Sequence, residues 1–231
     1  MGGFLYYEQF YFISGDMVYN FYYFIIFIGI VLSSFLALKK DDSPYLKYFS
    51  PFLTLTLFIE LLCLYLAKHS IHTISIINYF NIIETCFYLW VQKNIIKSKE
   101  IKKIVTIVLI GFPILCIINL LFWQGINNYN SITYSLGCLL IIFLSIYYFF
   151  ELFKLQHAVR LIVDSGFWIC TGLLFYYCVS FPVFVSVNLI KNFSIQLGEL
   201  VTFVLMIMNV ILYSLFCIAF ICRIRIRKYS L

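Results

Sequence analysis

Long runs of apolar residues, separated by short polar stretches, make up most of the chain after residue 16. A helix needs about 20 mainly apolar residues to cross the hydrocarbon core of a bilayer. Seven runs fit this requirement: 17–38, 49–67, 74–91, 104–122, 132–152, 167–189 and 195–221. The alternating segments of a membrane β-barrel are absent from the sequence. The pattern therefore predicts an all-α polytopic membrane protein, a bundle of seven transmembrane helices forming one domain over residues 1–231.

The composition supports this class of protein. Hydrophobic residues make up 64% of the 231 residues and charged residues 11%, and the mean hydropathy is +1.00. Soluble domains are roughly 45–50% apolar and about 25% charged. Because so few polar groups could not cover a soluble protein of this size, a lipid bilayer is the expected surrounding.

The basic residues predict an orientation for the seven spans. Of the 16 Lys and Arg residues, all but Lys68 and Lys191 fall in the first, third and fifth loops or in the C-terminal tail. Basic residues near spans favour the cytoplasmic side. An odd number of spans also requires the two ends to lie on opposite sides. We therefore expect the N-terminus outside and the C-terminus inside, in the cell (inner, cytoplasmic) membrane.

Two carboxyl groups lie deep in the predicted spans. Glu60 is eleven residues past Phe49 and Glu84 is ten residues past Ile74, so both lie ~15–17 Å from the ends of their spans. Because these two spans are neighbours in sequence and antiparallel, we expect the carboxyl groups at a similar depth. Ionisable residues inside a membrane are costly and typically face the interior of a bundle.

Further polar residues accompany these two acids. Asn81, Glu84, Thr85, Tyr88 and Gln92 recur at helical spacing and form one stripe along the third span. Spans six and seven add Tyr177 and Asn209. The predicted ligand or coupling site consists of Glu60, Glu84, Asn81, Thr85, Tyr88, Tyr177 and Asn209. Polar side chains also hold membrane helices together by hydrogen bonds, and this alternative stays open for all of them.

The tail is basic and predicts a contact surface at the inner face. It contains Arg223, Arg225, Arg227 and Lys228. Anionic lipid headgroups attract such clusters. A docking surface for a cytoplasmic partner is the alternative.

Sequence motifs for catalysis and cofactor binding are absent. There is no G-x-S-x-G, H-E-x-x-H or P-loop, so an enzyme is not expected. His69 and His72 have helical spacing, but no third ligand is evident, and there is no C-x-x-C pair. No metal, no cofactor and no nucleic-acid partner are predicted.

Three segments carry a resemblance to a known family. They are NIIETCFYLWV (81–91), FWICTGLLFYY (167–177) and MNVILYSLFCIAFICR (208–223). They resemble an uncharacterised family of small bacterial membrane proteins with seven helices. The resemblance implies association with separately encoded histidine kinases, and hence a membrane input role.

These observations leave three hypotheses for function. The first is a sensor or signalling subunit that binds a small or lipidic ligand within the bundle and relays to a cytoplasmic partner such as a histidine kinase. The second is a proton- or ion-coupled transporter or channel, although no internal repeat supports it. The third is a structural or assembly factor of a membrane complex.

Overall fold

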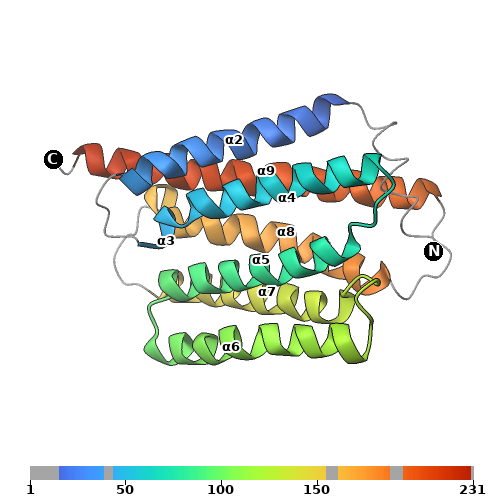
Figure 1. Cartoon of the computed structure of the whole chain (residues 1–231). Helices are drawn as coiled ribbons and strands as arrows, with labels where there is room; N and C mark the ends of the chain where they lie inside the picture. The colour runs from blue at the N-terminus through green and yellow to red at the C-terminus, as the bar shows by residue number, and fades with distance from the viewer. Residues whose placement is uncertain (1–15, 39–43, 155–160, 188–194, 230–231) are drawn as a thin grey trace. The chain divides into compact units, whose positions relative to one another are not determined.

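A computed structural model of the chain describes residues 16–38, 44–154, 161–187 and 195–229. Within these ranges the structure is all α, without strands, and its elements are labelled in Figure 1. They are α2 (Asp16–Leu38), α3 (Pro44–Lys47), α4 (Phe49–Lys68), α5 (Ile74–Ile95), α6 (Lys99–Phe122), α7 (Ser131–Phe153), the 3-10 turn η1 (Leu161–Val163), α8 (Ser165–Val187) and α9 (Ile195–Tyr229). Seven of the described helices are long and apolar enough to cross a membrane. The chain is thus a multi-pass helical membrane protein, as the apolar runs predict.

The helices extend beyond the apolar runs where polar residues can continue them. α6 begins at Lys99 rather than at Ile104, because Ser98 caps it: the Ser98 hydroxyl accepts a hydrogen bond from the Ile101 amide at 3.4 Å. α9 continues past Ile221 to Tyr229. Hydropathy locates the part of a helix that suits lipid, whereas capping and helix propensity set where the helix ends.

The helices group into two compact units. The first contains α2, α3, α4, η1, α9 and the beginning of α8, up to Tyr176. In this unit α2 packs against both α4 and α9 (Figure 1). Aromatic rings fill the contact between α4 and α9, where Phe49 lies edge-on to Phe216 at 5.2 Å and to Phe220 at 5.3 Å between ring centroids.

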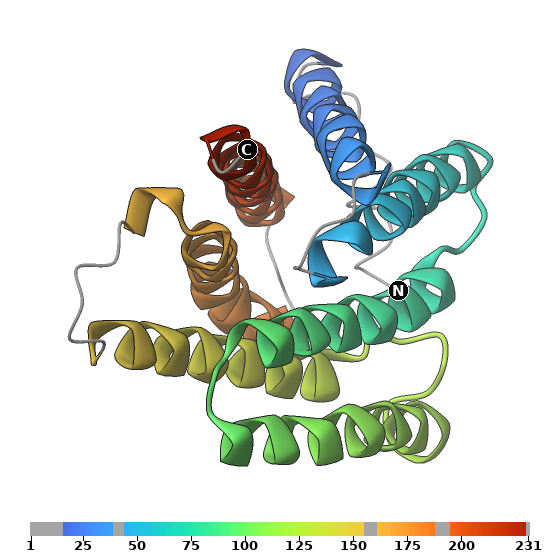
Figure 2. The ribbon, with the colours of Figure 1, turned by 90° about the vertical axis from the view of Figure 1, so that its left-hand side faces the viewer.

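The second unit contains α5, α6, α7 and the end of α8, from Tyr177. In this unit α5 packs against both α6 and α7 (Figure 2). A glycine permits close contact between α5 and α7. A Cβ at Gly137 would lie 2.8 Å from Cγ2 of Thr85 and 3.1 Å from Cζ of Phe112. Small residues at helix contacts are the usual means of close packing in membranes.

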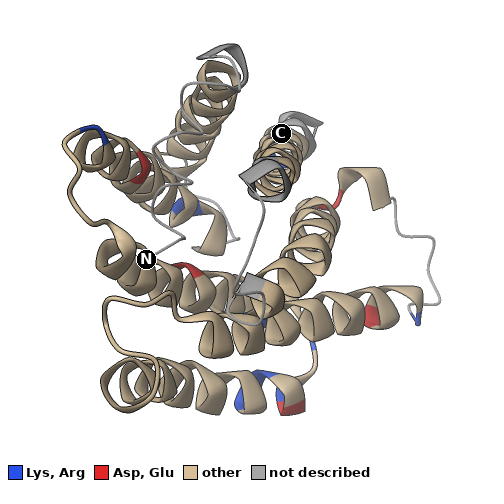
Figure 3. Cartoon of the chain, turned by 90° about the vertical axis from the view of Figure 1, so that its right-hand side faces the viewer, with Lys and Arg blue, Asp and Glu red and all other residues tan. Residues whose placement is uncertain are grey.

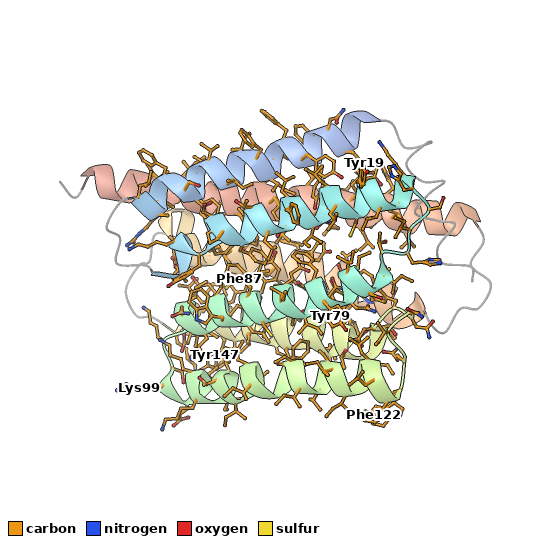
Figure 4. All side chains as sticks on the ribbon, in the orientation of Figure 1. Tyr19, Tyr79, Phe87, Lys99, Phe122 and Tyr147 are labelled. Atoms are coloured by element: carbon orange, nitrogen blue, oxygen red, sulfur yellow. The ribbon has the colours of Figure 1, made fainter. Side chains whose placement is uncertain are left out.

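The outward face of the second unit is apolar. Ile107 of α6 is 72% exposed, Ile110 is 65% exposed and Phe122 is 78% exposed. Figure 4 shows side chains projecting along the whole of α6, from Lys99 at one end to Phe122 at the other. Charged residues of α6 gather at the Lys99 end alone (Figure 3). This distribution is that of a helix whose middle contacts lipid.

Candidate functional site

The predicted site residues divide between the two units. Glu60 and Asn209 belong to the first unit, on α4 and α9. The others belong to the second unit: Asn81, Glu84, Thr85 and Tyr88 on α5, and Tyr177 on α8. Each unit is described by itself, so a common depth for Glu60 and Glu84 stays a prediction.

Glu60 is hydrogen-bonded to a tyrosine of the neighbouring helix. The Tyr22 hydroxyl, on α2, donates to Oε1 of Glu60 at 3.3 Å. Tyr22 is buried and Glu60 is half-buried. The bond ties α2 to α4 through a carboxyl group that lies within a membrane span.

Tyr22 also connects this carboxyl group to α9. Its ring lies 5.8 Å from the ring of Tyr213, between centroids, and 5.3 Å from that of Tyr23. Tyr176 of α8 also lies within electrostatic reach of the Tyr22 hydroxyl. Asn209 is half-buried one helical turn before Tyr213 on α9. The sequence offers no means of singling out Tyr22, because Tyr19 and Tyr23 occur in the same apolar run.

The polar stripe of α5 lies largely on its buried face. Glu84 is 8% exposed, Thr85 is 1% exposed, and Tyr88 and Gln92 are fully buried, whereas Asn81 is half-buried. The rings of Tyr88 and Tyr177 meet edge to face at 6.1 Å between centroids. The second unit therefore brings together two of the tyrosines named from the sequence.

Gln92 holds α5 to α7. Its Nε2 donates to the Ile141 carbonyl at 3.0 Å and to the Ser145 hydroxyl at 2.8 Å. Both bonds are buried. Hydrogen bonding between α5 and α7 therefore explains why Gln92 lies on the buried polar stripe of α5.

Five asparagines fasten the connection between α6 and α7 onto the start of α5. We call Asn78, Asn81, Asn119, Asn128 and Asn130 the asparagine latch. Asn78 donates to the Asn128 carbonyl at 2.8 Å and accepts from the Asn130 amide at 3.0 Å. Asn119 donates to Oδ1 of Asn130 at 2.6 Å, and Asn81 donates to the hydroxyl of Tyr129 at 3.2 Å. The two bonds of Asn78 satisfy backbone groups of a connection at the end of the spans, and the other two join side chains.

A small cavity lies beside the asparagine latch. Its empty volume is about 180 Å³ including its open side, and its enclosed part has room for about one water molecule. It is lined by Asn78, Asn81, Ile82, Thr85, Phe112, Cys116, Asn130 and Tyr134. Two residues of the predicted site, Asn81 and Thr85, thus line a cavity too small for a lipid chain.

The opposite end of the second unit is basic, and a carboxylate there accepts hydrogen bonds from the turn between α5 and α6. Oε2 of Glu151, at the end of α7, accepts from the Lys97 amide at 2.8 Å, and its Oε1 accepts from the Ser98 amide at 2.7 Å. Lys93, Lys99 and several further lysines lie at this end. Glu151 therefore caps the turn between α5 and α6, a role for which the hydropathy pattern gives no indication.

The basic tail continues α9 without a break. Arg223 is half-buried on α9. The helical backbone extends through Arg225, Arg227 and Lys228, whose side chains lie outside the described ones. Contact of the tail with lipid or with a partner stays a prediction.

Metal binding and similarity to other proteins give no further identification. In the described ranges, no group of three His, Cys, Asp or Glu residues could hold a metal ion. Comparison with protein families, with curated proteins and with solved structures finds no match to this chain. The resemblance to a bacterial seven-helix family therefore stays a prediction.

Proposed function

We propose that this chain is the sensor subunit of a signalling system, in the cytoplasmic membrane with its C-terminus inside. The observation that carries the proposal is the connection from Glu60 through Tyr22 to Tyr213 on α9. A carboxyl group inside a membrane is costly, and such residues are typically kept for function. Here the carboxyl group is hydrogen-bonded to Tyr22, and the ring of Tyr22 contacts Tyr213 on α9, the helix that ends in the basic tail.

In the proposed relay, α9 carries a change at Glu60 to the basic tail. A change of charge or occupancy at Glu60 alters its hydrogen bond with Tyr22, and with it the contact of Tyr22 with Tyr213. α9 is one helix of 35 residues, about 50 Å long. A shift at Tyr213 therefore displaces the basic end of the helix. An acidic surface of a cytoplasmic partner suits this end, and the sequence resemblance favours a histidine kinase.

The second unit serves as the fixed part in this proposal. Its helices are bonded at one end by the asparagine latch and at the other by Glu151. Gln92 joins α5 to α7 between them. Such a framework resists deformation within the second unit, so the moving helices of the proposal are those of the first unit.

The test is the phosphorylation of a histidine kinase encoded beside this chain, reconstituted with it in liposomes. Glu60→Gln removes the ionisable group that accepts from Tyr22, and Tyr22→Phe removes the hydroxyl that donates to it. We expect both to change the kinase activity at least severalfold. Glu84→Gln is measured in parallel, and Glu100→Gln, in the exposed first turn of α6, is the control. Unchanged activity in the Glu60 and Tyr22 variants, with normal folding, would exclude the relay.

A structural or assembly factor is the second candidate. It is favoured by the side chains of Asn78 and Gln92, whose amide nitrogens donate to backbone carbonyls of other segments of the chain. In that case one membrane partner should copurify in stoichiometric amount. Glu60→Gln would then reduce the yield of the complex and leave the kinase response intact.

A further inference from the structure

We propose that Glu60, together with the tyrosines around it, binds a small organic ammonium ion. The proposal names the ligand class of the proposed sensor, and its role in signalling rests on that proposed function. Binding is a property of the chain alone and can be measured without a partner.

The helical segments around Glu60 lack basic residues. No Lys or Arg occurs in the described part of α2, in α4 between Phe49 and Ala67, in α8, or in the described part of α9 before Arg223. Lys68 is eight residues from Glu60 along α4, about 12 Å along the helix axis. A carboxylate in a membrane interior is strongly unfavourable without a counter-charge. Because these described segments give Glu60 no basic partner, we infer that it takes up either a proton or a cation.

The side chains around Glu60 suit a cation with an apolar surface. Tyr22 and Tyr23 of α2 and Tyr213 of α9 form a cluster in which Tyr22 contacts the carboxyl group and both other rings. Aromatic faces attract cations, and organic ammonium ions most characteristically. Tyrosine rings with one carboxylate thus select a positive, partly apolar ligand over an anion or a neutral lipid.

The remaining titratable neighbours do not alter this selection. They are Cys63, one turn along α4 from Glu60, and Tyr176 of α8. Both are uncharged in their ordinary state at neutral pH. The carboxylate of Glu60 is therefore the one negative charge that these side chains can carry at neutral pH. A single charge matches a monovalent cation.

The experiment titrates the purified full chain in detergent with tetramethylammonium chloride, and with sodium chloride at equal ionic strength. Thermal unfolding is the readout. We expect a saturable rise in Tm with tetramethylammonium alone, because a ligand that binds only the folded state stabilises it. Glu60→Gln should abolish the rise. Tyr22→Leu, which removes the ring, should weaken binding more than Tyr22→Phe, which keeps it.

A second readout uses the wild-type chain and does not depend on the folding of any variant. Bound ligand should slow the reaction of Cys63 with a membrane-permeant maleimide, followed by mass spectrometry. Cys86, a thiol of the second unit that is half-buried like Cys63, is the control and should be unaffected.

Three results would overturn the proposal: an equal rise in Tm with sodium chloride, an undiminished rise in Glu60→Gln, or no effect of tetramethylammonium on Tm and on Cys63. If tetramethylammonium has no effect and acidification raises Tm in the wild type but not in Glu60→Gln, the occupant is a proton, and the ammonium site is rejected while the relay stands. Binding of tetramethylammonium without any change in kinase activity would instead exclude the relay and support the ammonium site.

Discussion

Gly137 determines how closely two helices of the second unit approach. The space that its missing Cβ leaves is taken by the methyl group of Thr85 and the ring of Phe112. Thr85 lies on the polar stripe and lines the cavity beside the asparagine latch. One small residue on α7 thus positions a predicted site residue of α5.

Replacing this glycine should destabilise the protein. In Gly137→Ala the new Cβ would lie 2.8 Å from Cγ2 of Thr85, which forces the helices apart. We expect a loss of about 1–3 kcal/mol in the free energy of unfolding, as for other overpacked cores. Thr85→Ser removes the clashing methyl group and should restore part of the loss in the double variant. Chemical unfolding in detergent measures both.

A second glycine provides the matched control. A Cβ at Gly111 of α6 would meet nothing within 4 Å. Because alanine favours a helix more than glycine does, Gly111→Ala should stabilise the protein by roughly 0.5–1 kcal/mol. Equal losses in both variants would show that any substitution harms the unit and that the contact with Thr85 has no special effect.

At the scale of helices, the ends of α5, α6 and α7 are fastened by different chemistry. Neutral amides hold the connection between α6 and α7, whereas the carboxylate of Glu151 holds the turn between α5 and α6. A carboxylate suits the second position because lysines surround that turn and because it lies at the N-terminal end of α6, where negative charge is favourable.

Removing this carboxylate should loosen the turn. Glu151→Ala leaves the amides of Lys97 and Ser98 without their acceptor, at a cost of about 1 kcal/mol, comparable to the loss of a helix cap. Hydrogen exchange at Lys97 and Ser98 should become faster, while exchange at the asparagine latch stays unchanged. Glu100→Ala, in the exposed first turn of α6, is the control and should cost only a few tenths of a kcal/mol. If Glu151→Ala and Glu100→Ala destabilise the protein equally, the loss would be due to the change in net charge and not to the loss of the cap.

The sequence predicts the helices well and the bonds between them only in part. Apolar runs locate all seven long helices, because lipid selects for length and hydropathy. The stripe on α5 identifies Asn81 and Gln92 as polar residues of one helix. Their partners, Tyr129 and Ser145, lie 48 and 53 residues further along the chain. No local pattern encodes such pairs, since they arise only when helices pack.

At the scale of the whole chain, the charges of the second unit distinguish its two ends. Basic residues gather where α5 ends, α6 begins and α7 ends. The connection from Trp123 to Asn130 contains no charged residue. If α6 spans the membrane as its length and hydropathy indicate, these two ends lie on opposite sides. Lysines near spans favour the cytoplasmic side, so the asparagine latch should lie outside.

Cysteine labelling tests this orientation. In a variant without the native cysteines, Asn127→Cys should react with a membrane-impermeant maleimide in intact cells, and Lys97→Cys only after permeabilisation. Both side chains are exposed, so burial does not protect either. Ile110→Cys, on the outward face of α6, is the control and should stay unlabelled because lipid covers it. The reverse labelling would place the asparagine latch in the cytoplasm and overturn the assignment from the lysines. Labelling of both loops in intact cells would show that α6 does not cross the membrane. If the predicted pattern is found, an odd number of spans places the basic end of α9 inside, where a cytoplasmic kinase can reach it.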